Sequence, residues 1–360
     1  MTYIVKGDNI NHLVYNTMDL LSNNGNVSSN RNQGSLGNTT YMNNVVLELS
    51  NPRSRHLNLV GRKNNLAAVI AETFWVMSGS NRVNPFLSYF LPRAKEFSDD
   101  GETWHGAYGD RIFKHGQVQS VIDIFKEEGL NTRRAVIDIY QSAVDSKFAL
   151  NTMLGIDKPK DVPCNNLIHF YVNDGKLNCN VFQRSGDLIW GTGNINIPEF
   201  TFLQEYIAQE IGVELGSYAH WVTNLHVYDK TSQQMMDVLD NSDSQDFEST
   251  NDTPLIFPNS KDIPIQIFFE GLVNLYSMMI IAENINSYEN SLLNIVDYFD
   301  QYNVPKEGNL LFSYAEVVLA YIYQKKLNNN IEDLTIPLSD YSEDLHKAMK
   351  NSHFKKFEVE

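Results

Sequence analysis

The sequence of 360 residues has few positive charges, almost no cysteine and no long apolar run. Its 28 Lys and Arg residues stand against 44 Asp and Glu residues, which gives a formal net charge of −16. This balance argues against a nucleic-acid-binding surface, which needs a basic face, although a few arginines in a cleft suffice to bind a small anion. No apolar stretch is long enough to span a membrane, so we expect no membrane association.

The two cysteines are Cys164 and Cys179. They are too few for a disulfide framework, and the N-terminus does not resemble a secretion signal. Both features favour a reducing, cytoplasmic setting. The length suits one large domain with an appendage, or two domains, and we expect no metal site.

Residues 162–187 read V-P-C-N-N-L-I-H-F-Y-V-N-D-G-K-L-N-C-N-V-F-Q-R-S-G-D. Two mostly apolar runs flank a D-G turn, which is typical of a hairpin of two strands. Cys164 follows a proline before the first strand, and polar residues follow the second strand: Gln183, Arg184, Ser185 and Asp187. An arginine near a cysteine can hold an anionic substrate while the sulfur attacks it.

Apolar periodicity and capping residues predict the other regular elements before residue 230. The predicted helices are 8–24, with Asp8 as the N-cap, 65–78, 117–128 and 198–211. The predicted strands are 42–49, the run after Arg134, and the run that ends with His226 and Tyr228. The remaining long segments, 25–37, 100–113 and 141–161, have the composition of loops.

Several charged side chains admit both a structural and a functional interpretation. Glu72 is the only acid in an apolar helix, so it either reaches a rim or occupies a site that raises the pKa of its carboxyl group. Arg133 and Arg134 stand before a strand and point to opposite sides of it, which also fits a surface ion pair.

Two further features admit the same pair of interpretations. Arg31 lies in a glycine-rich loop whose backbone N–H groups can bind an anion, or which is simply a surface loop. His226 and Tyr228 share one strand face, where they can hydrogen-bond a sugar hydroxyl or lie half-buried without a function.

The composition changes near residue 230, which predicts three parts. Residues 1–230 form the catalytic domain, and residues 231–262 form an acidic, polar linker. Residues 263–360 form a helical C-terminal extension, with helices at 266–284, 287–302, 312–327 and 341–353.

Three motifs occur in order: P-C before a strand, Q-R-S-x-D after the next strand, and H-x-Y after the following helix. In this respect the chain resembles the thymidylate synthase family, which includes the phage deoxypyrimidine hydroxymethylases. The resemblance implies an α+β fold, with a mixed, twisted sheet flanked by helices. It also implies a homodimer formed through the sheet face and 5,10-methylene-tetrahydrofolate as the one-carbon donor.

The resemblance assigns roles to residues by their motif positions. Cys164 resembles the thiolate that adds to C6 of a pyrimidine nucleotide, and Arg184 is placed to lower its pKa. The residues that resemble phosphate ligands are Arg184, Ser185, Arg31, and the pair Arg133 and Arg134, which reaches the partner's site in this family. Gln183 belongs to the same substrate-binding motif.

The remaining assignments concern the sugar, the base and the folate. His226 and Tyr228 resemble the ligands of the deoxyribose 3′-OH. Glu72 resembles the acid that organises water and proton transfers at the base, and Tyr108 lies in a matching A-Y-G-D-R segment. Asp187 resembles the carboxylate that faces the folate pterin.

An asparagine in the loop after Q-R-S-x-D is expected to read the base. Counting back from His226 gives Asn196, whereas counting forward from Arg184 requires one inserted residue, and Asn194 is the fallback. An asparagine amide can pair with N3–H and O4 of uracil, so dUMP is favoured over dCMP.

Three departures from the synthases bear on the product. Asn165 follows the cysteine where synthases usually have histidine, and G-T-G-N-I-N replaces the usual loop. The short apolar tail that closes over the folate is replaced by the extension. Since synthases must exclude water and hydroxymethylases admit it, we favour a dUMP hydroxymethylase. The alternatives are a thymidylate synthase, a dCMP hydroxymethylase and a non-catalytic paralogue.

Overall fold

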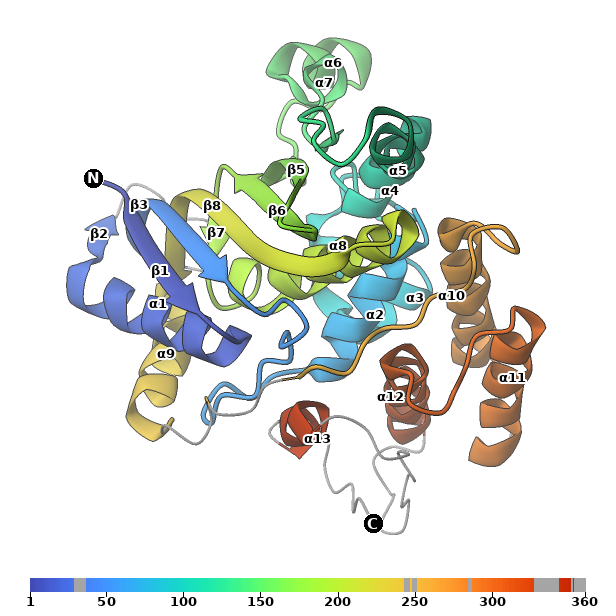
Figure 1. Cartoon of the computed structure of the whole chain (residues 1–360). Helices are drawn as coiled ribbons and strands as arrows, with labels where there is room; N and C mark the ends of the chain where they lie inside the picture. Colours follow the sequence, from blue (N-terminus) through green and yellow to red (C-terminus); the bar gives the residue numbers. More distant parts are fainter. Residues whose placement is uncertain are drawn as a thin grey trace.

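The computed structural model describes residues 1–28, 37–242, 247, 251–283, 287–326, 343–350 and 352, and Figure 1 shows the arrangement of their helices and strands. Arg31, predicted to contact phosphate, lies outside the described residues.

One eight-stranded sheet runs through the first two thirds of the chain, in the order β1-β3-β8-β6-β5-β4, with β2 paired to β3 and β7 paired to β8. β1–β3, β6–β8 and β7–β8 are parallel pairs, and the other pairs are antiparallel. The mixed sheet with helices packed on it confirms the predicted α+β fold. The strands are β1 Tyr3–Gly7, β2 Asn26–Ser28, β3 Thr39–Leu49, β4 Val136–Asp138, β5 Asn165–Asn173, β6 Lys176–Gln183, β7 Gly186–Asp187 and β8 Glu214–Tyr228.

The β5–β6 hairpin confirms the predicted pair of strands. Its turn residues, Asp174 and Gly175, have φ values of 49° and 73°, as a tight turn of the I′ type requires. At the open end of the hairpin, the backbone N–H of Arg184 donates to the carbonyl of Cys164 at 2.9 Å. The hairpin therefore holds the thiol-bearing residue beside the arginine.

Helices pack on the sheet and on one another (Figure 1). Contacts join α1 to β1 and β3, α8 to β6 and β8, and α2 to α8. The helices before residue 262 are α1 Ile10–Asn24, α2 Leu66–Met77, α3 Phe86–Phe90, α4 Tyr108–Phe113, α5 Gln117–Glu128, α6 Ser142–Asp145, α7 Lys147–Met153, α8 Ile197–Ile211 and α9 Asp229–Asn241. Short 3₁₀ turns at Pro92–Phe97 and Lys114–Gly116 and a π turn at Thr192–Asn196 complete this part.

The predicted helices 65–78, 117–128 and 198–211 are present as α2, α5 and α8. In α8, Pro198 lies in the first turn and Gly212 ends the helix with φ 71°. The two ends of α8 are predictable because proline and glycine restrict or permit particular backbone angles at their own positions.

Some local predictions were wrong. The N-cap of α1 is Asn9 rather than Asp8, because the Asn9 side chain accepts the N–H of His12 at 2.9 Å. The range 100–113, predicted as a loop, ends in α4. The range 141–161, also predicted as a loop, contains α6 and α7. Ser146 caps the N-terminus of α7, and Leu150 of α7 is buried.

The C-terminal part is helical, as predicted. Its helices are α10 Ile265–Ile281, α11 Tyr288–Gln301, α12 Leu310–Lys326 and α13 Glu343–Lys350. Contacts join α10 and α12 to α2 (Figure 1). The Phe74 and Phe269 rings lie 5.3 Å apart, so the extension and the sheet-bearing part share one hydrophobic core.

A buried ion cluster fastens α8 to two distant segments. Glu205 of α8 accepts from Arg55 and, at 2.9 Å, from Nε of Arg53. The same carboxylate accepts the backbone N–H of Leu255 at 3.1 Å. Because Arg55 and Glu205 are almost fully buried, each charge depends on the other for compensation.

We expect Glu205→Ala to lower the free energy of unfolding by about 3 kcal/mol or more, because it leaves the guanidinium of Arg55 buried without its partner. Denaturant titration followed by circular dichroism measures this loss. The matched control is Glu48→Ala, which removes the exposed Lys6–Glu48 pair at 2.7 Å and is expected to cost under about 1 kcal/mol. Equal losses in the two variants would contradict the buried-cluster interpretation.

Candidate active site

The thiol of Cys164 lies where the loop before β5 meets the end of β6. Arg184 donates through Nε to the carbonyl of Pro163 at 3.0 Å and through Nη2 to that of Val162 at 2.8 Å. Burial raises the pKa of the Cys164 thiol, while the positive charge of Arg184 opposes that rise and the carboxylate of Asp161 adds to it. Arg184 thus both braces the cysteine loop and favours the thiolate.

A buried chain of hydrogen bonds runs from the end of β6 into α8. Thr192 Oγ1 donates to Gln183 Oε1 at 2.7 Å, and Gln183 Nε2 donates to Asn196 Oδ1 at 3.1 Å. Asn196 Nδ2 donates to Glu199 Oε1 at 2.9 Å. A side chain at Gly186 would clash with Thr192 and Gln183, so a glycine there permits their close approach.

The residue after the cysteine, Asn165, is fully buried, and its side chain contacts a residue of β8. Its Oδ1 lies 3.1 Å from His220 Nε2, and His220 Nδ1 lies 2.7 Å from the hydroxyl of Tyr218. Burial lowers the pKa of His220 to about 3, so its ring is neutral and has one donor and one acceptor nitrogen. An amide backed by a neutral histidine therefore occupies the position next to the thiol.

Two carboxyl groups enter the site from facing helices, Glu72 from α2 and Glu199 from α8. Burial raises the pKa of both groups, and the proximity of Glu72 raises that of Glu199 further. Burial also raises the pKa of Tyr108, with smaller contributions from Cys164 and Glu199. These mutual effects place the thiol, the phenol and the carboxyl groups around one site, and acids with raised pKa values are suited to proton transfer near neutral pH.

Asp187 lies on β7 opposite His226 of β8. Its Oδ1 accepts the N–H of Ile189 at 2.9 Å, and burial raises its carboxyl pKa to about 6 although the charge of Arg62 opposes the shift. The Arg62 guanidinium is also 5.3 Å from the centroid of the half-exposed Trp190 ring. This corner offers a carboxylate and an indole surface.

His226 and Tyr228 share a face of β8, as predicted, and their ring centroids lie 4.8 Å apart. Burial raises the pKa of Tyr228 to about 12, with contributions from Asp187 and Cys164. Both residues therefore border the same site as the thiol.

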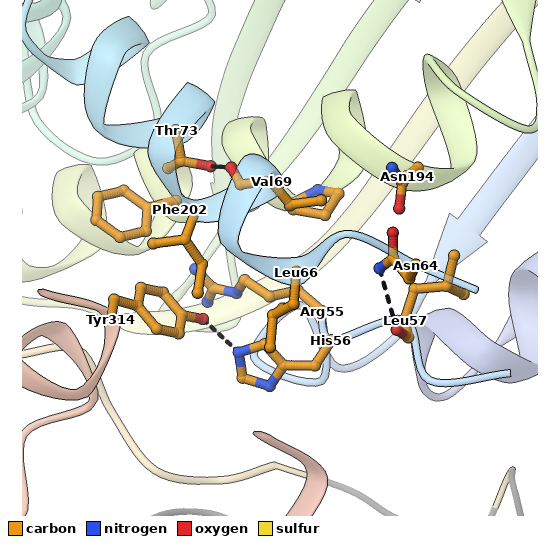
Figure 2. Close-up of a pocket in the computed structure, with 12 residues that line it drawn as sticks. Arg55, His56, Leu57, Asn64, Leu66, Val69, Thr73, Asn194, Phe202 and Tyr314 are labelled. Atoms are coloured by element: carbon orange, nitrogen blue, oxygen red, sulfur yellow. Dashed lines mark hydrogen bonds between the residues drawn. The ribbon is translucent and has the colours of Figure 1, made fainter. Parts of the chain in front are cut away.

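The fallback base reader, Asn194, occupies a different place from Asn196. It lines a small internal cavity with Asn64 and Leu66, near Tyr314 of α12 (Figure 2). Asn196 instead bonds to Gln183, the neighbour of Arg184. Of the two asparagines, Asn196 is therefore the one that is linked to the segment that carries Arg184.

Arg133 and Arg134 are the predicted ligands that lie apart from this cluster. Both are exposed just before β4. The register of β4 with β5 places Arg134 near the turn of the β5–β6 hairpin, whereas Cys164 lies at the open end of that hairpin. Arg134 donates to Glu128 at the end of α5. Within a single chain, Arg134 forms a surface ion pair with Glu128.

Sequence reasoning missed four polar residues of the site: Arg62, Thr192, Glu199 and His220. Glu199 has the same signal that identified Glu72, an acid within the apolar run I-P-E-F-T-F. The other three have no distinguishing local pattern.

A sheet with a cysteine before β5 and an arginine after β6, and with carboxyl groups brought in by two packed helices, has the arrangement of an enzyme site. The model of the thymidylate synthase family matches residues 14–251, and the chain belongs to that family. The matched region extends through α9, which lies partly in the range predicted as a linker.

Three phage proteins, each named deoxyuridylate hydroxymethyltransferase, are similar to this chain. That of Delftia phage PhiW-14 is 40% identical over 326 residues, which cover 90% of this chain and 89% of the relative. That of Bacillus phage SP01 is 30% identical over 70% of this chain and 64% of its own length. That of Pseudomonas phage M6 is 34% identical over 52% of each.

Among the described residues, no helix is long and apolar enough to cross a membrane. The same residues contain no group of three or more His, Cys, Asp or Glu side chains arranged to hold a metal ion.

We expect the alkylation of Cys164 by iodoacetamide at a fixed pH near 8 to slow by roughly three- to tenfold in Arg184→Met. Loss of the positive charge raises the thiol pKa, and less thiolate is then present at that pH. Peptide mass spectrometry measures the rate, with the fully buried Cys179 as an internal standard that stays unmodified. Arg184→Lys is the matched control and should retain most of the rate; an unchanged or faster rate in Arg184→Met would contradict the electrostatic role.

Proposed function

We propose that this protein transfers a one-carbon unit from 5,10-methylene-tetrahydrofolate to C5 of dUMP and releases 5-hydroxymethyl-dUMP. The observation that carries the proposal is the 40% identity to the deoxyuridylate hydroxymethyltransferase of phage PhiW-14 over nine tenths of both chains. The polar site around Cys164 supports it, because each required chemical group has a candidate there.

In this proposal, Cys164 adds to C6 of the pyrimidine as a thiolate, which makes C5 nucleophilic. Arg184, with Ser185 next to it, binds the phosphate, and Arg31 joins them from its loop. His226 and Tyr228 bind the deoxyribose hydroxyl. Gln183 orients Asn196, whose amide pairs with the base.

Glu72 and Tyr108 handle the proton transfers that accompany bond formation at C5. The raised pKa of the Glu72 carboxyl lets it give and take a proton near neutral pH. The C5 proton is then removed, and the bond between the one-carbon unit and the folate nitrogen breaks, so that tetrahydrofolate leaves. Water adds to the one-carbon group now held at C5, and Cys164 leaves from C6 as the double bond of the base is restored.

The Asp187 corner has groups that fit the folate. Its carboxylate can accept from ring N–H donors of a pterin, and the half-exposed Trp190 offers a flat apolar surface beside Arg62. Methylene-tetrahydrofolate supplies the one-carbon unit when bound there. Asp187 and Glu72 would hold it facing Cys164.

We infer a homodimer formed through the open sheet face. Trp221 is 43% exposed on β8 and stacks on Phe182 of β6 at 5.8 Å between ring centroids. An exposed tryptophan stacked on a neighbouring aromatic ring of a sheet is suited to burial by a second copy. In such a dimer, Arg133 and Arg134 serve the phosphate of the partner's site, which explains their distance from Cys164 in one chain.

The proposal assigns residues 1–230 to catalysis, 231–262 to a linker that contains most of α9, and 263–360 to the extension. It also places the enzyme in the cytoplasm, where the free thiols Cys164 and Cys179 stay reduced.

Incubation of the protein with dUMP and methylene-tetrahydrofolate should yield 5-hydroxymethyl-dUMP and tetrahydrofolate. Mass spectrometry of the nucleotide and the absorbance of dihydrofolate distinguish this reaction from reductive methylation. Formation of dTMP and dihydrofolate would replace the proposal with thymidylate synthesis, the reaction named by the matched family.

The covalent step has its own control. 5-Fluoro-dUMP with the folate should form a stable adduct on Cys164, which Cys164→Ala loses and Cys179→Ala keeps. A protein that is folded but forms no adduct would be a non-catalytic paralogue.

Mixing two inactive variants should restore activity if arginines cross the dimer. In a heterodimer of Cys164→Ala with the double variant Arg133→Ala and Arg134→Ala, one site has both its thiol and the partner's arginines. Random reassortment then gives about a quarter of the parent activity by turnover assay. In the control mixture, the Cys164→Ala chain also carries both arginine substitutions, and no activity should return. If subunit exchange is demonstrated and the first mixture still regains no activity, the shared site is refuted.

A further inference from the structure

Glu199 is a buried acid to which the reaction proposed above gives no task. It lies in the first turn of α8 and is 1% exposed. Its Oε1 accepts from Asn196 Nδ2 at 2.9 Å, while its Oε2 has no hydrogen-bond partner among the described residues. A buried carboxyl group is costly, so its retention beside the base-reading amide calls for a reason.

An asparagine amide does not by itself distinguish uracil from cytosine. With its oxygen toward N3–H and its nitrogen toward O4, the amide of Asn196 complements uracil. Turned by 180°, the same amide donates to the unprotonated N3 of cytosine and accepts from its 4-amino group. Selection of uracil therefore requires that the amide is held in one orientation.

The hydrogen-bond chain in the structure contains one group that can set this orientation. Thr192, Gln183 and Asn196 are a hydroxyl and two amides, which can all reverse together without losing a hydrogen bond. A carboxylate cannot donate, so Glu199 requires the NH₂ group of Asn196 to face it. Burial raises the pKa of Glu199 and so favours the neutral carboxyl group. The structure leaves Oε2 without a hydrogen-bond partner among the described residues, and with the proton on Oε2 the oxygen Oε1 accepts from Asn196 as it does in the ionised form.

Each end of the Asn196 amide keeps one unused site in this arrangement. Oδ1 accepts one hydrogen bond from Gln183 and has a second lone pair, and Nδ2 donates one hydrogen to Glu199 and has a second hydrogen. The remaining acceptor and donor match N3–H and O4 of uracil. An aspartate at position 196 would instead place two carboxyl groups at hydrogen-bonding distance.

We propose that Glu199 is a positioning residue that holds the Asn196 amide in the uracil-reading orientation and thereby sets the preference for dUMP over dCMP. The inference rests on the proposed function in one respect, since it requires that Asn196 faces a pyrimidine base. It does not depend on whether the product is a hydroxymethyl or a methyl nucleotide.

The test is the ratio of the dissociation constants for dUMP and dCMP, measured by calorimetry in Glu199→Gln and in the parent protein. A glutamine can present either its oxygen or its nitrogen, so the Asn196 amide is free to turn. We expect the preference for dUMP to fall on the order of tenfold, with dCMP binding more tightly than in the parent. A merely structural role would weaken both nucleotides equally.

Glu210→Gln is the matched control, because it makes the same change about three turns further along α8. It should keep the parent's ratio. A folded Glu199→Gln protein with the parent's ratio, or with equal weakening of both nucleotides, would overturn the proposal.

If Glu199→Gln does not fold, Thr192→Val tests the other end of the chain. Orientation set by Glu199 predicts an unchanged preference in this variant, and a lost preference would show that Thr192 sets it instead. The product assay on the parent protein separates the two proposals. Formation of dTMP would refute hydroxymethylation while the binding ratio still reports on Glu199.

Discussion

The hydrogen bond from the Arg184 N–H to the Cys164 carbonyl is the constraint on which the site depends. It closes the open end of the β5–β6 hairpin, so the register set by the Asp174–Gly175 turn, together with the irregularity between Asn165 and Leu167, decides what faces the thiol. A shift of one residue would turn the side chains of β6 to the opposite face of the sheet and take Gln183 away from Asn196. The chemistry at the thiol is thus determined by strand pairing ten residues away.

The helices supply the polar groups that the hairpin lacks. α2 and α8 pack against each other and bring Glu72 and Glu199 together in an apolar surrounding. Burial of these groups costs free energy, and it also shifts their pKa values. It raises the pKa of both acids and lowers that of His220, which stays neutral. The same dehydration strengthens every hydrogen bond to a bound base. The Arg55–Glu205 pair joins the other half of α8 to a distant segment of the chain.

Features that depend on a few neighbouring residues could be predicted from the sequence, whereas features that depend on packing between distant segments could not. The hairpin and α8 were predictable because a D-G turn, Pro198 and Gly212 act over a few residues. Glu199 was missed although it stands in an apolar run, because an acid in the first turn of a helix is also favourable on the surface, where it complements the helix dipole. Only the packing of α2 and β8, remote in sequence, buries it. The roles of Cys164, Arg184 and Asp187 were assigned from their motif positions, whereas Arg62 and His220 come near these residues by long-range packing alone.

The helical extension acts on this arrangement through the helices that carry the site. Tyr314 of α12 lies 2.5 Å from Nε2 of His56 and stacks on Phe202 of α8, at 6.3 Å between ring centroids. Phe269 of α10 packs against Phe74 of α2 and also against Phe202. Phe74 is two residues from Glu72 and Phe202 is three from Glu199, so the extension packs on the two helices that carry these acids.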